Sequence, residues 1–238
     1  MTNLLRSVRL FVLEKWFLSK YPTAEPGSTA WLVATELKFG GRHTGVQRNR
    51  VSPSDPRSEE QLKAGGMIGG DRMLHHGYAD HYSRHTSRFV RRSAPVTVVE
   101  VGILLGGGLA LWSELFPSGR IIGLDIDLQH TRGNLANLRA RGAFTHAPPE
   151  LYEFDQFADN IELVLAILKS NRIDIAIDDG FHSDETILKT IESLRPFLAE
   201  DFTYFIEDND TAHVKIAEQY PEFRVTNFGQ LTIVESRN

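Results

Sequence analysis

The sequence has no cysteine among its 238 residues. This absence excludes disulfide bonds and thiolate metal sites, and it fits a cytoplasmic protein. No run of apolar residues approaches the roughly 18 that a membrane-spanning helix needs, and the net charge of −5 offers no general attraction for nucleic acid or anionic lipid. We therefore expect a cytoplasmic protein with no nucleic-acid or membrane partner. The 41% of hydrophobic residues is enough for the core of one large domain.

The first 20 residues predict an amphipathic helix. Apolar side chains recur at helical spacing over residues 3–20, while Arg6, Arg9 and Lys15 interrupt any stretch that resembles a secretory signal. Such a helix packs on the core or on a second subunit, so a homo-oligomer formed through this helix is one expectation. A helix that lies on a membrane surface is the alternative.

Residues 21–70 break any long element, because prolines and glycines recur throughout the stretch. A strand or a short helix is expected at residues 30–39. The almost entirely polar residues 40–60 predict either a disordered loop or a lid over a binding site. We accordingly divide the chain into an N-terminal helical and lid segment, residues 1–93, and a core, residues 94–238.

Residues 96–127 have the pattern of a nucleotide-binding βαβ unit. A largely β-branched run, residues 96–101, predicts a buried strand of a parallel sheet. A glycine-rich turn, a helix and a second strand follow, and the second strand ends in an acid. The glycines allow the backbone to approach a ligand closely, and the acid accepts hydrogen bonds from ribose hydroxyls. The predicted nucleotide contacts are Gly102, Gly106, Gly107 and Asp125.

The spacing of these glycines favours S-adenosylmethionine over NAD. A dinucleotide fingerprint, G-x-G-x-x-G, opens a helix toward a pyrophosphate, whereas here three bulky residues follow Gly102. The carboxylate of Glu100, at the end of the first strand, would repel a pyrophosphate and suits a cationic ligand with an amino-acid tail. A glycine-rich turn that binds no ligand is the alternative.

A second group of acids follows two later strands. Residues 173–177 alternate as a strand and lead into Asp178 and Asp179, and a strand at residues 202–206 leads into Glu207 and Asp208. The carboxyl ends of parallel strands form the ligand crevice of an open α/β sheet. If these strands are neighbours, their acids repel one another unless a cation lies between them. This predicts a divalent metal held by oxygen ligands, and solvated acids at two strand ends are the alternative.

The glycine turn and its flanks resemble a known family. The segments Glu100-Val101-Gly102, Gly106-Gly107-Gly108-Leu109 and Gly123-Leu124-Asp125 are similar to class I S-adenosylmethionine-dependent methyltransferases that modify antibiotic sugars, such as the macrocin, mycinamicin and novobiocin O-methyltransferases. The resemblance runs from about residue 69 to residue 210. It implies an α/β fold with a Rossmann-like, seven-stranded sheet and an N-terminal helical and loop extension. Gly108 departs from the family, in which serine is expected.

The resemblance assigns roles to the acids and to a histidine. Asp179, Glu207 and Asp208 match the family's metal ligands, with Mg²⁺ as the expected ion, and His182 matches the catalytic base, which Asp179 accompanies. Asp155 and Gln156 resemble the pair beside the adenine. Asp178 and Glu100 are further expected cofactor contacts. A structural role for His182 is the alternative.

The histidine-rich stretch before the core resembles the family's segment that closes over the active site. Substrate contacts are expected from His75, His76, Tyr78 and Tyr82. His81 and His85 have the i, i+4 spacing of a metal pair, but no acid accompanies them, so a zinc site is not favoured. Arg72 stands where the family has a lysine.

The resemblance implies methyl transfer from S-adenosylmethionine to a sugar hydroxyl, on an antibiotic or other natural product or on its activated precursor. A hydroxyl is a poor nucleophile at neutral pH, so a divalent ion that lowers its pKa and a histidine that takes its proton suit this acceptor. Two alternatives stay open. One is an N-methyltransferase that acts on an aminosugar and needs no metal, and the other is a catalytically silent subunit that binds S-adenosylmethionine.

Overall fold

The computed structural model describes residues 2–237, with side chains from residue 9 to residue 237. Its centre is a seven-stranded sheet in the order β5-β4-β3-β6-β7-β9-β8, in which β9 is antiparallel to both neighbours and the other pairs are parallel. The strands are β3 (Thr97–Val101), β4 (Arg120–Asp125), β5 (Glu150–Glu153), β6 (Ile173–Asp178), β7 (Leu198–Ile206), β8 (Phe223–Phe228) and β9 (Leu231–Ser236). The predicted seven-stranded α/β sheet is confirmed.

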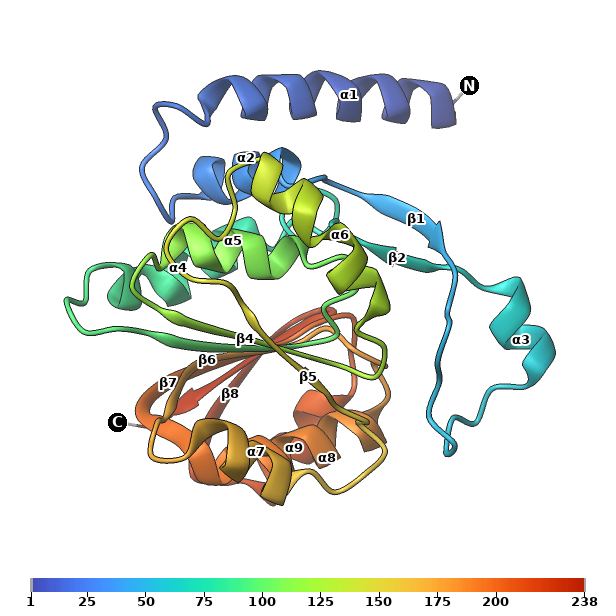
Figure 1. The fold of residues 1–238 in the computed structure, drawn as a ribbon, viewed down its shortest axis with the longest axis vertical. Coiled ribbons are helices and arrows are strands. Elements are labelled where there is room, and N and C mark those ends of the chain that lie inside the picture. The colour runs from blue at the N-terminus through green and yellow to red at the C-terminus, as the bar shows by residue number, and fades with distance from the viewer. Residues whose placement is uncertain (1, 238) are drawn as a thin grey trace.

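Helices cover both faces of this sheet (Figure 1). One face carries α2 (Thr29–Lys38), α4 (Ala79–Val90), α5 (Gly107–Leu115) and α6 (Gln129–Ala140), and α1 (Thr2–Lys20) packs outside α2. The other face carries α7 (Ile161–Leu168), α8 (Asp184–Leu194), the 3₁₀ turn Arg195–Phe197 and α9 (Ala212–Gln219). Because successive strand residues point to opposite faces, Val98 joins the core under α5 and Val99 joins the core over α8.

The central strands β3 and β6 are buried along their whole length. Their continuous β-branched and apolar sequences follow from this, since both faces of a parallel strand are covered by helices. The acids that end each strand are therefore carried to the same edge of the sheet. This edge is where the site lies.

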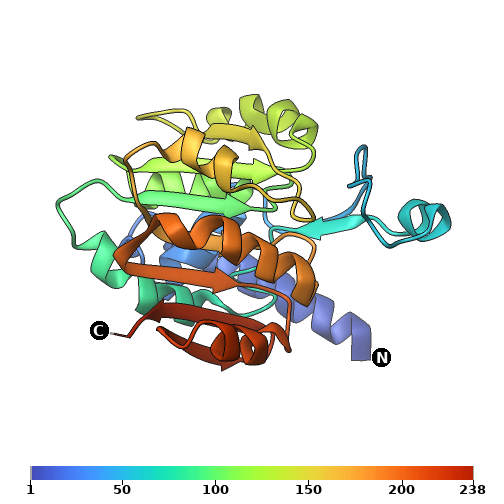
Figure 2. The same cartoon turned by 90° about the horizontal axis from the view of Figure 1, so that it is seen from below.

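The polar region after α2 forms ordered structure that the sequence did not specify. Strands β1 (His43–Val46) and β2 (Met67–Gly69) pair antiparallel, and a short helix α3 (Glu59–Ala64) lies between them. Figure 2 shows that this hairpin projects beyond the carboxyl ends of the parallel strands. Residues 30–39, for which a strand or a short helix was expected, lie in helix α2 and its C-cap, Phe39.

Helix α1 leaves Phe11, Val12 and Trp16 exposed. The homo-oligomer expected through this helix stays a prediction. Among residues 2–237, no helix combines the length and the apolar character needed to cross a membrane.

Candidate functional site

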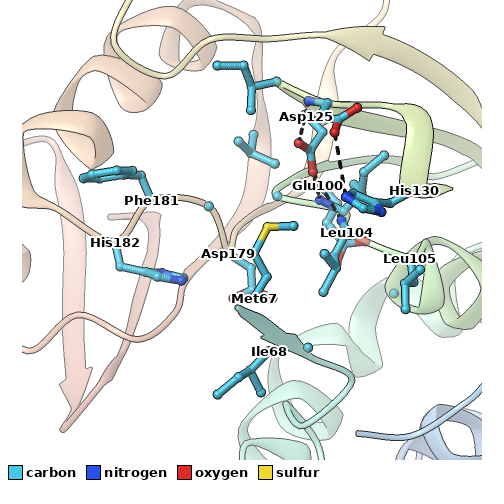
Figure 3. Close-up of a pocket in the computed structure, with 18 of the residues that line it drawn as sticks. Met67, Ile68, Glu100, Leu104, Leu105, Asp125, His130, Asp179, Phe181 and His182 are labelled. Atoms are coloured by element: carbon cyan, nitrogen blue, oxygen red, sulfur yellow. Dashed lines mark hydrogen bonds and ion pairs between the residues drawn. The ribbon is translucent and has the colours of Figure 1, made fainter. Parts of the chain in front are cut away.

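A cavity of about 550 Å³ lies at the carboxyl ends of the central strands. Its walls come from the glycine turn after β3, the ends of β4 and β6, and the β1–β2 hairpin. Figure 3 shows Phe181 and His182 on one side, Asp125, Leu104 and His130 on the other, and Met67 of β2 between them. The hairpin therefore closes a crevice that the sheet alone would leave open.

The glycine turn fits tightly against the end of β6. Gly102 has a φ of +82°, and a Cβ added there would lie 2.1 Å from the carbonyl oxygen of Asp179. Only glycine permits this backbone conformation and this approach together. Gly106 (φ +77°) begins α5 in the left-handed region, while a Cβ on Gly107 would meet open space. Gly102 and Gly107 thus place bare backbone along one wall of the cavity, whereas Gly106, predicted as a further contact, is buried against Thr131 and Leu138 and does not line it.

Glu100 lies at this wall with its carboxylate turned inward. It accepts hydrogen bonds from Arg72 Nη2 (2.7 Å) and from Trp112 Nε1 (3.1 Å). Burial raises the pKa of Glu100, and the charge of Arg72 opposes that shift. A Cβ on Gly108 would lie 2.2 Å from Glu100 Oε1, so the departure from serine has a steric reason.

Two acids after β4 face the same part of the cavity. Asp125 accepts backbone hydrogen bonds from Ile103 (2.9 Å), Leu104 (3.2 Å) and Asp127 (3.0 Å), so it holds the glycine turn in place. Asp127 is buried, and its Oδ2 accepts no hydrogen bond from residues 9–237, although His130 Nε2 lies 3.7 Å away. A buried oxygen of this kind requires a donor, and a ribose hydroxyl is a suitable one. Asp127 is thus a candidate site residue that joins the predicted Asp125.

Asp155 and Gln156, the pair predicted beside the adenine, have different surroundings. Asp155 lines the cavity and accepts a hydrogen bond from Ser52 of the lid at 2.7 Å. Gln156 also lines it, but its amide bridges Asp178, Thr190 and the backbone of Phe181.

Asp178 lies behind Gln156, outside the cavity lining, and burial raises its pKa to about 6. The predicted direct contact of Asp178 with the cofactor is not supported by this position. Its carboxylate instead anchors the end of β6, where Gln156 and the Gly180 amide donate to it.

Asp179, His182 and Asp208 come together at the floor of the cavity. Each offers a ligand atom, and these atoms all lie within 4.8 Å of one another. His182 (φ +66°) and Asp208 (φ +56°) both have left-handed backbone conformations, which are uncommon outside glycine and concentrate at functional sites. His182 Nδ1 lies 3.2 Å from the carbonyl oxygen of Glu207. A proton on Nδ1 that is donated to this carbonyl leaves the lone pair on Nε2.

Glu207 faces away from this group. Its Oε1 forms an ion pair with Arg72 Nε at 2.6 Å and also accepts a hydrogen bond from the hydroxyl of Tyr82. Arg72 lies among Glu100, Asp179 and Glu207, with Nη2 3.1 Å from Asp179. Burial opposes the charge of Arg72, but the carboxylates of Glu207 and Glu100 raise its pKa. Burial and the nearby Glu207 raise the pKa of Asp179.

Of the four expected substrate residues, only His76 lines the cavity. Its Nδ1 lies 3.4 Å from Asp208, and its hydrogen bond with Asp71 raises its pKa. Tyr78 donates to Asp208 at 2.9 Å. Two expectations are corrected: Tyr82 is fully buried in the core, and His75 faces Glu14 of α1, 3.7 Å away. Neither side chain lines the cavity.

Residues 49–52, which belong to the segment predicted as a lid, contact the core beside Asp155 and His130. Asn49 Nδ2 lies 3.1 Å from His130, and Arg50 pairs with Glu153 at 2.6 Å. With the Ser52–Asp155 hydrogen bond, these contacts hold the lid across the ends of β4 and β5. These contacts show that residues 49–52 are ordered against the core, and a lid function for the segment stays a prediction.

Comparisons with known proteins agree with this geometry. The chain is 30% identical over 146 residues to the mycinamicin VI 2''-O-methyltransferase of Micromonospora griseorubida, over 58% of this chain and 33% of that protein. It is 30% identical over 152 residues to an 8-demethyl-8-α-L-rhamnosyl tetracenomycin-C 2'-O-methyltransferase of Streptomyces olivaceus, over 61% of this chain and 36% of that protein. The aligned region thus spans about a third of these curated relatives. No protein-family model matches the chain.

A solved structure shares the fold. A methyltransferase of the mycinamycin biosynthetic pathway, in complex with Mg, SAH and mycinamycin VI, matches with a TM-score of 0.52 and 23% identity. The match covers 67% of this chain and 49% of that one. The chain therefore has the class I methyltransferase fold, and its sequence is homologous to O-methyltransferases that act on sugars.

Proposed function

We propose that this chain, a homologue of the sugar O-methyltransferases, transfers a methyl group from S-adenosylmethionine to a sugar hydroxyl. The observation that carries the proposal is the juxtaposition of His182, Asp179 and Asp208 with the glycine turn in one cavity. The turn supplies a nucleotide wall, and the three side chains supply a base and two carboxylates beside it. The substrate class is a sugar on a natural product or on its activated precursor.

The cavity has features that fit S-adenosylmethionine. Gly102 and Gly107 leave backbone accessible along one wall, and Oδ2 of Asp127, which accepts no hydrogen bond from residues 9–237, suits a ribose hydroxyl. S-adenosylmethionine, when bound, supplies the electrophilic methyl group. The chain's own contribution is to hold the acceptor oxygen in line with that methyl group and to exclude water beneath the lid, so that positioning carries much of the rate.

His182 is the proposed general base. The carbonyl of Glu207 favours the tautomer with its proton on Nδ1, which leaves Nε2 able to take the proton of the acceptor hydroxyl. Its left-handed backbone is held by Asn209, whose side chain donates to the carbonyl oxygen of His182 at 2.9 Å. The imidazole is thereby fixed before the substrate arrives.

A divalent metal also fits part of this site. Asp179 and Asp208 offer hard oxygen donors compatible with Mg²⁺ or Mn²⁺, and His182 lies beside them with Nε2 kept for the proton of the acceptor. Such an ion lowers the pKa of a hydroxyl that it coordinates. Of the sequence-predicted ligands Asp179, Glu207 and Asp208, the side chain of Glu207 faces Arg72 and not this group.

The test is a search for acceptors followed by mass spectrometry. The purified protein, incubated with S-adenosylmethionine and a panel of glycosylated macrolides, sugar nucleotides and aminosugars, should produce S-adenosylhomocysteine and a product heavier by one methyl group. Activity on a hydroxyl that is lost in chelator and restored by Mg²⁺ supports metal assistance. Methylation of an amine that persists in chelator would move the assignment to an N-methyltransferase. Binding of S-adenosylhomocysteine without turnover on any acceptor would favour a silent subunit.

A further inference from the structure

Arg72 is surrounded by carboxylates. Its guanidinium lies 2.7 Å from Glu100, 3.1 Å from Asp179 and 2.6 Å from Glu207, and its side chain is only 8% exposed. A buried guanidinium cannot lose its proton at any pH at which the protein is folded. A permanent positive charge is therefore built into the place where the sequence suggested that acids would gather around a metal.

The guanidinium divides the neighbouring acids into two kinds. The side chain of Glu207 is 3% exposed, and its Oε1 is shared between Arg72 and the Tyr82 hydroxyl. The side chains of Asp179 and Asp208 are each 28% exposed and line the cavity. Glu207 and Asp208 are consecutive residues, yet one faces the interior and the other faces the ligand space.

We infer that Arg72 is a resident cation that withdraws Glu207 from the metal-ligand set, so that a divalent ion is held by the carboxylates of Asp179 and Asp208. The inference rests on the metal-assisted form of the proposed function. Arg72 also contacts Asp179, so arginine and metal compete for this carboxylate. Because like charges repel, Arg72 weakens metal binding while it keeps Glu100 and Glu207 neutralised in the interior.

The test uses a charge-balanced double variant, Arg72→Gln with Glu207→Gln. The pair of substitutions removes one positive and one negative charge, so the net charge of the cluster is unchanged. Mn²⁺ serves as the probe because its free concentration can be followed by electron paramagnetic resonance during a titration. The double variant should bind Mn²⁺ at least as tightly as the wild-type protein, since Asp179 is released from Arg72. Binding that is weaker by about tenfold or more would overturn the inference, because it identifies Glu207 as a ligand.

Asp208→Asn in the wild-type background is the matched control. It removes a cavity carboxylate with little change in size and should weaken Mn²⁺ binding by about tenfold or more. Unchanged Mn²⁺ binding in Asp208→Asn would also overturn the assignment. Circular dichroism and S-adenosylhomocysteine binding establish that each variant is folded, and they test the cofactor site separately from the metal site.

A second measurement starts from the wild-type protein. In wild-type protein with ¹³C-labelled glutamate carboxyls, added Mg²⁺ should shift infrared bands of unlabelled aspartate carboxylates and leave the glutamate bands in place. A shifted glutamate band that disappears in Glu207→Gln would overturn the inference. If the double variant binds Mn²⁺ and the wild-type protein does not, Arg72 excludes the metal. This result supports competition between Arg72 and the metal for Asp179, and it contradicts the metal-assisted form of the proposed function. If neither binds Mn²⁺, both fail.

Discussion

Two networks of arginine and carboxylate side chains lie at different places on the sheet. The Arg72 network joins Arg72 to Glu100, Asp179 and Glu207, so acids outnumber the cation. In the Glu235 network, one carboxylate meets Arg88 at 2.9 Å, Arg224 at 2.7 Å and His85 at 3.1 Å, so potential cations outnumber the acid. The first lies at the carboxyl ends of the parallel strands, and the second ties α4 to β9.

The difference shows how the position of a network relates to its use. All oxygens of Glu235 are covered by donors from α4, β7 and β8, so the carboxylate is neutralised and holds the elements together. In the Arg72 network one guanidinium cannot satisfy three carboxylates, and the surplus charge faces the cavity through Asp179. Charge that is fully matched stabilises the fold, whereas charge left over at the strand ends is available to a ligand or a metal.

The largest expected effect concerns His182, which lies in the cavity beside the Arg72 network. His182→Ala removes the proposed base and should lower the turnover rate by about 100- to 10,000-fold. The melting temperature and S-adenosylhomocysteine binding should change little, because the hydrogen bond of the imidazole among residues 9–237 is the one to the Glu207 carbonyl. His146→Ala, an exposed histidine, is the control. A rate that is unaffected would show that His182 is structural and would direct attention to His76.

The second effect concerns the Glu235 network, which we expect to stabilise the fold. Burial opposes ionisation of Glu235, but its hydrogen bonds with His85, Arg88 and Arg224 lower its pKa to about 2. A depressed carboxyl pKa stabilises the fold above the unfolded pKa of about 4.5, and this contribution is lost as the pH falls toward 2. Glu235→Gln should therefore reduce the free energy of unfolding by about 2–3 kcal/mol at neutral pH.

Urea titrations of wild type and Glu235→Gln between neutral and acidic pH measure this contribution. The difference between the two proteins should shrink as the pH falls from about 4.5 toward 2. S-adenosylhomocysteine affinity at neutral pH should be the same in both. A loss of affinity without a loss of stability would break the distinction between the two networks.

A smaller effect concerns the unpaired oxygen of Asp127. Asp127→Asn replaces an acceptor with a donor and should weaken S-adenosylhomocysteine binding by about tenfold, equivalent to about 1.4 kcal/mol. Isothermal titration calorimetry measures this, with Asp159→Asn, an exposed acid outside the cavity, as the control. Equal S-adenosylhomocysteine affinities of Asp127→Asn and the wild-type protein would show that Asp127 does not bind the ribose. Asp125 would then be the acid expected to bind it.

The smallest effect concerns the lid. Ser52→Ala removes one hydrogen bond to Asp155, so opening of the lid should become easier by about 0.5–1.5 kcal/mol. Trypsin should cleave within residues 40–70 about two- to tenfold faster, and S-adenosylhomocysteine should slow this cleavage. Ser54→Ala, whose side chain is exposed, is the control. Cleavage that is the same with and without ligand would contradict a lid that closes over the cofactor.

The sequence by itself determined the sheet and the positions of its terminal acids. Strands such as Thr97–Val101 and Ile173–Asp178 are long β-branched runs because helices cover both faces, and the acids follow at the strand ends. The crossover pattern of a parallel sheet then carries Asp125, Asp179 and Asp208 to one edge. Gly102 was predictable for the same reason, since a close approach at a strand end requires glycine.

Only the tertiary structure decided which way each acid faces and what neutralises it. Glu207 and Asp208 are neighbours in the sequence, but Glu207 turns inward because Arg72, brought in by the segment before α4, meets it there. The same applies to Tyr82, expected at the substrate and found beneath Glu207. Periodicity and spacing describe local structure, whereas the partner of a buried charge comes from a distant part of the chain, and its position is fixed only when the helices pack on the sheet.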